Sequence, residues 1–397
     1  MFKKLFWLPC VCILFFADAI MPVLAQQKKI DFLLQDEAKL AALRQQYKVG
    51  DASVVESVKT LINEADKALK EGPYSVTLHK AKIAPSGDVH DYVSQAPYWW
   101  ADPSKPDGKP YIRKDGERNP EIYQLHDDSQ LNELCTSVRK LGFAYYFTGN
   151  EVYAQKAALL LNTWFIDAAT RMNPNLNYAQ YIPGINDGRG IGIIESRALG
   201  DIPDALAMMQ NSPNVNGKLV DGVKQWFGQY LNWLQTSKNG TDEHGSQNNH
   251  GTYYDMQVVD FALFTGDKKL ARNYLQQQTI GRIDTQFTPE GKQPLELERT
   301  KSWGYTNMNL DGWCRLATLA SHLDIDLWHM QKDGKSIKQC IAYIMPYALK
   351  QKQWEYKQIE PMGYNETLAI CLMAESHYPD IDFKQVYKMY KQPMPWM

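Results

Sequence analysis

Residues 147–154, Phe-Thr-Gly-Asn-Glu-Val-Tyr-Ala, are echoed by residues 264–271, Phe-Thr-Gly-Asp-Lys-Lys-Leu-Ala. In both stretches an apolar pattern of helical spacing leads up to a glycine, which can adopt the left-handed conformation that ends a helix. The Asn or Asp that follows can cap the next helix. This is the chemistry of a short connection between two helices. Because it occurs twice, it predicts repeated helical hairpins, which favour a toroid of paired helices around a central cleft.

Apolar residues recur at helical spacing on both sides of these turns and along most of the chain. The same spacing predicts helices over residues 54–70, 131–141, 152–165, 193–209, 219–233, 253–264, 268–277, 313–323, 336–350 and 365–376. No set of alternating strands is evident, which predicts an all-α fold. No Ser/Gly/Pro-rich linker divides the chain after its first 25 residues, so we expect a single domain over residues 26–397.

The first 25 residues have the features of a secretory signal peptide. A basic start precedes the apolar residues 5–16, and residues 23–25 place small side chains where a signal peptidase reads them. Cleavage there would leave Gln26 as the N-terminus of a periplasmic or secreted protein with no further membrane contact. The apolar stretch is short for an uncleaved membrane anchor. Cys10 and Cys12 leave a lipoprotein open, although neither lies in a convincing lipobox.

Composition restricts the partners of the chain. It carries 43 Lys and Arg against 45 Asp and Glu, a formal net charge of −2. Such a balance gives no general attraction for polyanions, so we expect no nucleic-acid partner, and an acidic polymer would need a local basic cluster. The 11 Trp and 23 Tyr fit either an aromatic core or a carbohydrate-binding surface. We expect buried free thiols, with one disulfide left open, at Cys135, Cys314, Cys340 and Cys371.

Three stretches break the helical pattern, and loops are where binding and catalytic residues concentrate. They cover residues 79–128, 173–192 and 239–251. The last precedes a helix predicted to start near Thr252, where amides and an imidazole could cap the helix or bind a carboxylate. The stretch Asp187–Gly192 superficially resembles a phosphate loop, but no strand precedes it, so a dinucleotide site is weakly supported.

Residues 297–305 contain a second group of reactive side chains. Arg299, Trp303 and Tyr305 lie within two helical turns of one another. They could form a buried Arg–Glu pair with core aromatic residues. Alternatively, Arg299 could neutralise a carboxylate while Tyr305 moves a proton, helped by the guanidinium because the ordinary pKa of tyrosine is about 10.

Three motifs together resemble the alginate lyase family of polysaccharide lyases. They are Tyr98-Trp99-Trp100 with Asp102-Pro103, then Asn248-Asn249-His250, then Arg299 with Tyr305, and the resemblance covers roughly Tyr74 to Glu375. It implies an incomplete (α/α) toroid with substrate across its cleft. It further implies β-elimination of a uronic-acid polymer, alginate first and glucuronan second, to give 4,5-unsaturated ends. No metal-ligand cluster or cofactor motif is evident, so we expect neither a metal nor a cofactor.

The resemblance also implies roles for individual residues. Asn249, His250 and Arg299 would neutralise the uronate carboxylate and stabilise the enolate-like intermediate. Tyr305 would be base, acid or both, with His250 the other candidate base. Stacking on sugars falls to Tyr98, Trp99, Trp100 and Trp303. The candidates for binding hydroxyls or carboxylates are His90, Arg113, Arg118, Asn119, Asn177, Gln180 and Asn248.

Two other classes of function stay open. A glycoside hydrolase on a similar toroid would need two carboxylates facing one bond, and the acids available are Glu243, Glu296, Glu298 and Asp311. A non-catalytic glycan-binding protein could use the same aromatic residues, but it would leave the Asn249, His250, Arg299 and Tyr305 group unexplained. The preference for mannuronate, guluronate or glucuronate, endo or exo action, and the oligomeric state are not encoded in any pattern that we recognise.

Overall fold

The computed structural model describes residues 29–390, and the predicted signal peptide lies outside them. The helices of this part are α1 (Glu37–Val49), α2 (Ala52–Ala68), α3 (Asp127–Thr148), α4 (Glu151–Phe165), α5 (Asp201–Met209), α6 (Gly217–Thr236), α7 (Lys238–His244), α8 (Asn249–Thr265), α9 (Lys268–Gln277), α10 (Arg282–Gln286), α11 (Pro294–Leu297), α12 (Ser302–Ser321), α13 (Ile337–Ala348), α14 (Asn365–Ala374) and α15 (Lys384–Met389). Three 3₁₀ segments add η1 (Pro120–Gln124), η2 (Gly190–Gly200) and η3 (Thr279–Gly281).

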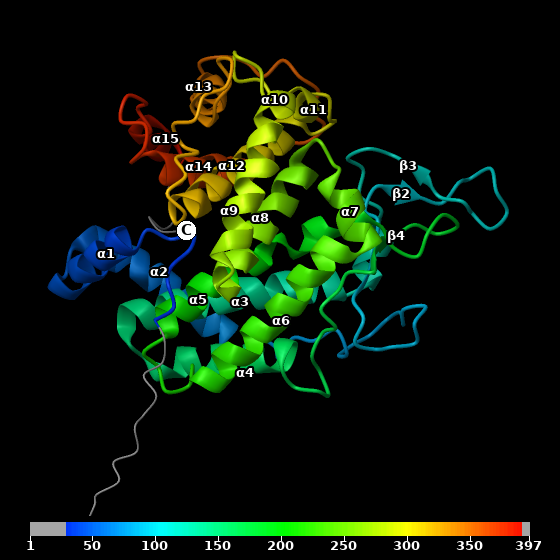
Figure 1. The fold of residues 1–397 in the computed structure, drawn as a ribbon, viewed down its shortest axis with the longest axis horizontal. Helices are drawn as coiled ribbons and strands as arrows, with labels where there is room; N and C mark the ends of the chain where they lie inside the picture. The colour runs from blue at the N-terminus through cyan, green and yellow to red at the C-terminus, as the bar shows by residue number, and fades with distance from the viewer. Residues whose placement is uncertain (1–28, 391–397) are drawn as a thin grey trace, which may run out of the picture.

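The predicted all-α toroid of helical hairpins is confirmed. Helix α3 packs on α4 and α5, helix α8 packs on α6, α9 and α12, and α12 packs on α14. Figure 1 shows α8 and α9 in the middle of the molecule, α1 and α2 at one edge, and the strands next to α7 at the opposite edge. The predicted helical ranges coincide with observed helices, except that residues 190–200 are 3₁₀ rather than α.

Both halves of the sequence echo form the predicted turns. Gly149 ends α3 with φ 69° and Gly266 ends α8 with φ 94°, each in the left-handed region. Asn150 Oδ1 then accepts a hydrogen bond from the main-chain N–H of Val152 in α4. The carboxylate of Asp267 caps α9 in the same way. Each turn reverses the chain in a few residues, so that α3 lies against α4 and α8 against α9.

Short strands occur where we expected none. Strand β1 (Val93–Gln95) pairs in parallel with β4 (Tyr178–Tyr181), and β2 (Trp99–Trp100) pairs antiparallel with β3 (Ile112–Arg113). The expectation is wrong here because strands of two to four residues are too short to show an alternating pattern. The β1–β4 pair ties the first predicted loop to the second, and the two strands β2 and β3 form a hairpin, residues 99–113.

The predicted loop over residues 239–251 is also largely wrong. It contains α7, which Ser237 caps by accepting a hydrogen bond from Gly240 N at 2.9 Å, and the first turn of α8. Helix α8 starts three residues before the predicted Thr252, because the side chain of Asn248 caps it. Helix α7 and the first turn of α8 carry few apolar side chains, so the sequence shows no apolar residues at helical spacing there. Asn249 and His250 consequently lie in a helix and not in a loop.

One cluster of buried apolar side chains runs from Ile30 to Val386. Four tryptophans, Trp164, Trp303, Trp313 and Trp328, are fully buried in it, so much of the aromatic content serves the core. All four cysteines of the described residues are buried free thiols, as predicted. Across residues 29–390, no helix is both long enough and apolar enough to cross a membrane.

Candidate active site

The first turns of α8 and α12 bring the four catalytic candidates into one region. Asn249 and His250 open α8, Tyr305 lies in the first turn of α12, and Arg299 belongs to the turn that precedes α12. Helices α8 and α12 pack against each other. Glu296 links the two groups, because its carboxylate bonds to Asn249 and its main-chain oxygen accepts from the N–H of Arg299 at 3.2 Å. Two separate motifs of the sequence therefore face a common site.

Arg299 and Tyr305 form a close pair. The guanidinium carbon lies 3.7 Å from the centre of the Tyr305 ring, and Nη2 donates a hydrogen bond of 2.8 Å to the phenol oxygen. The phenol in turn donates to the hydroxyl of Tyr98 at 2.9 Å. Burial raises the pKa of Tyr305 and Tyr98 raises it further, whereas the charge of Arg299 lowers it. In the free protein Tyr305 is thus a neutral phenol that can donate a proton.

Asp115 is a partner of Arg299 that sequence reasoning missed. Its carboxylate accepts from Nη2 at 2.8 Å and from Nε at 3.3 Å, and it also accepts from the main chain and hydroxyl of Thr300. Although burial alone would raise the pKa of Asp115, the bonds and charge of Arg299 lower it to about 2. The ion pair between Asp115 and Arg299, called the latch below, attaches the end of the hairpin to the turn before α12. No sequence signal marks one aspartate in a polar loop as an arginine partner.

Asn249 is fixed by a second carboxylate. Its main-chain N–H and its side-chain Nδ2 donate to the two oxygens of Glu296 at 2.6 and 2.7 Å. Burial raises the pKa of Glu296, and the bonds from Asn249 oppose that shift. The amide oxygen of Asn249 is buried without a hydrogen-bond partner among the described residues. The amide is therefore held in one orientation by Glu296, and the residue has no exposed surface.

His250 is oriented by a third carboxylate. Its Nδ1 lies 2.7 Å from Oε1 of Glu243, which is almost fully buried in α7. A carboxylate accepts a hydrogen bond, so Nδ1 carries a proton and Nε2 is the nitrogen left to take one up. Asn248 serves the helix, since its Oδ1 accepts from the main-chain N–H of His250 at 3.3 Å. The capping role considered for this motif thus applies to Asn248.

The hairpin presents some of the expected binding residues. Trp99 and Trp100 are half-buried, and Trp100 donates from Nε1 to a main-chain oxygen at 3.0 Å while Lys114 lies over its ring. Arg113 is exposed and pairs with Asp115 at 2.7 Å. Tyr98 bonds to Tyr305 as described above, so it adjoins the proposed chemistry directly.

Asn119 and Trp303 are structural. Asn119 is buried and donates to the main-chain oxygen of Trp99 at 2.9 Å, which holds the hairpin. Trp303 has no exposed surface, donates from Nε1 to Gly363 O at 2.6 Å and packs edge-on against Trp354. The expectation that Trp303 stacks on a sugar is wrong, because its spacing on α12 turns it into the core while Tyr305 faces the site.

Three other expected binders make no contact with the four catalytic candidates among the described residues. His90 bonds through Nδ1 to the main-chain oxygen of Arg171 at 2.7 Å. Asn177 accepts a hydrogen bond from Trp233 Nε1 at 2.9 Å. Arg118 is exposed. The structure brings these three neither to each other nor to Tyr305 by any hydrogen bond, so their assignment stays a prediction.

Gln180 is buried, and it leads to an arginine that the sequence did not single out as a site residue. Its Oε1 accepts a hydrogen bond of 2.8 Å from Nη2 of Arg189. Burial lowers the pKa of Arg189 to about 10, and Glu243 is among the charges that act on it. Arg189 lies in the Asp187–Gly192 stretch, whose sequence pattern resembles only a phosphate loop. Its place beside the His250–Glu243 pair could not be read from the spacing.

The carboxylates needed by a glycoside hydrolase are occupied by other side chains. Glu243 holds His250, Glu296 holds Asn249, and Asp311 accepts from Tyr253 and Arg315 at 2.9 Å each. Glu298 is exposed. Within the described part of the chain, no group of three or more His, Cys, Asp or Glu side chains is arranged to hold a metal ion.

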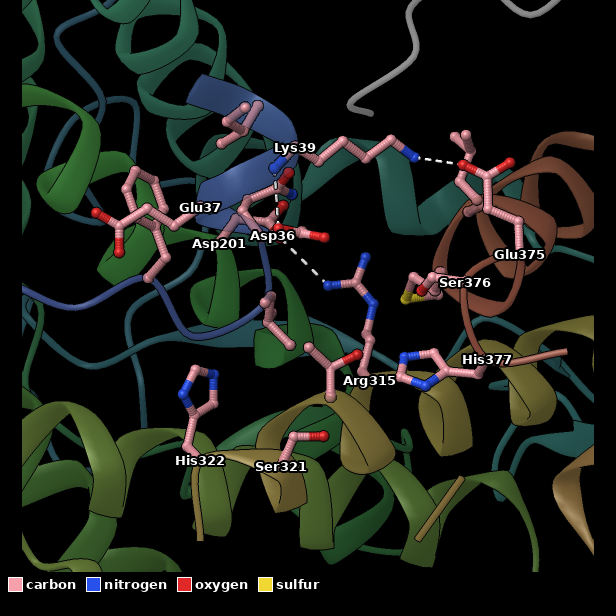
Figure 2. A pocket seen from close by; sticks show the side chains of 18 of the residues that line it. Asp36, Glu37, Lys39, Asp201, Arg315, Ser321, His322, Glu375, Ser376 and His377 are labelled. Atoms are coloured by element: carbon pink, nitrogen blue, oxygen red, sulfur yellow. Dashed lines mark hydrogen bonds and ion pairs between the residues drawn. The ribbon is translucent and has the colours of Figure 1, made fainter. Parts of the chain in front are cut away.

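A cavity of about 520 Å³ lies elsewhere in the molecule (Figure 2), lined by the segment before α1 and by α3, α12 and α14. Lys39 and Glu375 form an ion pair of 2.6 Å at this cavity, and Arg315 reaches Asp201 at 3.3 Å. None of the four catalytic candidates lines it. Its size therefore does not make it the active site.

Comparison with known proteins identifies the family. The model of the alginate lyase family matches residues 75–354. An alginate lyase from Bacteroides ovatus is 41% identical, with 91% of this chain and 96% of that chain covered and a TM-score of 0.86. Alginate lyase A1-III from Sphingomonas species A1 is 19% identical over 88% of this chain and 89% of that one, with a TM-score of 0.54, which supports the fold alone. No curated protein matches. The chain therefore belongs to the alginate lyase family.

Proposed function

We propose that this protein is a polysaccharide lyase that cleaves alginate by β-elimination at the site formed by Asn249, His250, Arg299 and Tyr305. The observation that carries the proposal is the Arg299–Tyr305–Tyr98 arrangement, in which a phenol lies under a guanidinium and bonds to a second phenol. Membership of the alginate lyase family supports it, as does the 41% identity to the alginate lyase from Bacteroides ovatus.

The reaction needs one base and one acid. The base removes the proton from C5 of a uronate, the electron pair forms the C4–C5 double bond, and the C4–O4 bond breaks. The departing O4 takes a proton from the acid, so the products are an unsaturated uronate end and a free hydroxyl. Neither water nor an oxidant is consumed. Tyr305, neutral in the free protein, is suited to protonate O4.

The proton on C5 is acidic enough only when the neighbouring carboxylate is neutralised. Arg299 can supply positive charge and donors to it, and His250 can do so once Nε2 carries a proton as well. The amide of Asn249 is held beside them by Glu296. The base is His250 through Nε2, or Tyr305 after its proton has passed to solvent, in which case Arg299 stabilises the phenolate and the proton taken from C5 is then given to O4. These side chains can do the neutralisation alone, so we propose a reaction without metal or cofactor.

The test is a screen of acidic polysaccharides, with alginate, glucuronan and a neutral glucan as control, followed by the ultraviolet absorbance of the conjugated double bond. We expect absorbance to rise with alginate and to persist after extensive chelation. New reducing ends without absorbance would show a glycoside hydrolase. Binding of alginate without any product would show a glycan-binding protein. A calcium-restored loss after chelation would contradict the metal-free mechanism.

We also propose that the protein is exported, because residues 1–25 have the features of a signal peptide. Mass spectrometry of the protein from its native host should find an N-terminus at or near Gln26. An intact Met1 on that protein would contradict export by cleavage.

A further inference from the structure

The stretch Asp187–Gly192 has a structural explanation that a phosphate loop does not provide. A side chain at Gly188 would collide with the main chain of Asn177, just before β4, and a side chain at Gly190 would collide with the main chain of Asn239 in α7. Only glycine permits such close approach on both sides. The two glycines therefore allow Arg189, the residue that they flank, to lie between β4 and α7.

Arg189 is held firmly but is not neutralised. Its main-chain N–H donates to Ala179 O at 3.1 Å, and its Nη2 donates to the neutral amide of Gln180 at 2.8 Å. Its Nε is buried and has no hydrogen-bond partner. Among the described residues, no carboxylate lies within ion-pair distance of this guanidinium, whereas Arg299 and Arg282 each hold an aspartate at 2.8 and 2.7 Å.

At longer range the charges of Glu195 and Glu243 favour the cationic form of Arg189, but neither carboxylate forms an ion pair with it. Glu195 is half-buried, and burial together with the charge of Asp128 raises its pKa to about 8. Glu243 is already bonded to His250. Arg113 adds a like charge from the hairpin. A largely buried cation without an ion-pair partner is unfavourable in a protein interior, so an incoming anion would stabilise it.

A cation without an ion-pair partner beside the site has the sign opposite to that of a polyuronate. Gly190 brings the turn that carries Arg189 against the main chain of Glu243, the residue that orients His250. Among the described residues, no hydrogen bond or ion pair joins Arg189 to the four catalytic candidates. Every sugar of a polyuronate carries a carboxylate, so a neighbouring sugar must also place an anion along the cleft. The wall formed by β4 and α7 offers one guanidinium for it.

We propose that Arg189 binds the carboxylate of a uronate next to the sugar being cleaved, and so selects charged polymers. The inference rests on the proposed function. Because this carboxylate is bound equally in the ground state and the transition state, Arg189 contributes to KM and not to kcat. The glycines at 188 and 190 and the amide of Gln180 are positioning residues for it.

The test measures binding in a background that cannot turn over. Tyr305→Phe protein is titrated calorimetrically with a saturated alginate tetrasaccharide and with the same tetrasaccharide after reduction of its carboxyl groups. Adding Arg189→Gln should weaken binding of the charged ligand about 10-fold or more, the usual weight of a charge-assisted hydrogen bond. It should leave binding of the neutral ligand unchanged, and Arg189→Lys should recover part of the loss.

The matched control is Arg139→Gln, which removes a partly buried arginine that pairs with Asp201 at 3.4 Å beside the cavity of Figure 2. It should leave both affinities unchanged. Equal binding by Arg189→Gln and its parent, or equal losses for charged and neutral ligands, would overturn the inference. If the wild-type protein neither binds nor cleaves any polyuronate, the proposed function itself fails, which is a different result.

Discussion

Two arginine clusters with different chemistry lie along α12, one at its N-terminal end and one in its second half. Near its start, Arg299 shares its guanidinium between Asp115 and the phenol of Tyr305. In the second half of the helix, Arg315 is bound by the carboxylates of Asp311 and Asp201 beside the cavity of Figure 2. The second cluster is an arginine held by two carboxylates, and among the described residues no phenol donates to or accepts from the guanidinium of Arg315. Thus the available proton chemistry, and not the volume of the cavity, distinguishes the active site.

The largest expected effect belongs to the first cluster. Tyr305→Phe keeps the ring under Arg299 but removes the transferable proton, so kcat should fall by ~10²–10⁴-fold, the usual weight of general acid–base catalysis. Affinity and melting temperature should change little. Tyr253→Phe, which removes a phenol bonded to Asp311, is the matched control and should keep kcat. Near-normal turnover by Tyr305→Phe would move the proton transfer to His250.

Truncating each arginine should separate the two clusters. Arg299→Ala should lose both rate and affinity, because this side chain adjoins the phenol and can meet the carboxylate throughout the reaction. Arg315→Ala should instead lower the free energy of unfolding by ~1–3 kcal/mol, since two carboxylates lose their partner, and leave kcat close to that of the wild type. Comparable losses of kcat in both variants, measured on folded protein, would erase the distinction between the two ends of α12.

A smaller effect is expected at the carboxylate that orients His250. Glu243→Gln removes the charge that fixes the proton on Nδ1, so kcat/KM should fall by about 10-fold, as for other partners that orient a functional histidine. Glu298→Gln, at an exposed acid in the turn after α11, is the control. Unchanged kinetics in Glu243→Gln would mean that the imidazole needs no orientation by this residue.

The smallest effect concerns the latch between Asp115 and Arg299. The folded-state pKa of Asp115, about 2, is below its ordinary value of 3.8, so the ion pair stabilises the fold fully above pH 4 and the stabilisation is lost as pH falls toward 2. Asp115→Asn should therefore lower the melting temperature at pH 6 and reduce its decline between pH 4 and 2. If the melting temperatures of the variant and the wild type differed by the same amount at every pH, the ion pair would not be a titrating contact.

Periodicity predicted the ring of hairpins but not the details that position the site. Gly149 and Gly266 could be recognised because a left-handed glycine followed by a capping residue has a local signature. The contacts of Asp115, Glu243 and Glu296 could not, because each joins residues that are distant in sequence or lies in a short helix without an apolar stripe. The motifs predicted which side chains react, and the carboxylates that orient them appeared only in the structure.

Linear spacing misplaces both Trp303 and Arg189: it predicts Trp303 at the site and leaves Arg189 out of it. Trp303 lies in a motif of reactive residues, yet the geometry of α12 turns it into the core two residues before Tyr305. Arg189 lies in a stretch for which the sequence predicts no role in the site, yet the two flanking glycines let it lie between β4 and α7, near Glu243. Linear spacing predicts which residues are close along a helix. It does not predict which face is buried or what a loop brings near.

The most direct test of the account is the stoichiometry of bond cleavage by the wild-type protein on alginate. New reducing ends and the absorbance of the C4–C5 double bond are measured in the same reaction. β-Elimination through the Arg299–Tyr305 pair predicts one double bond for every new reducing end, and both signals should fall together in Tyr305→Phe. Reducing ends that accumulate without the double bond, or a double bond that forms at the wild-type rate without the phenol, would contradict it.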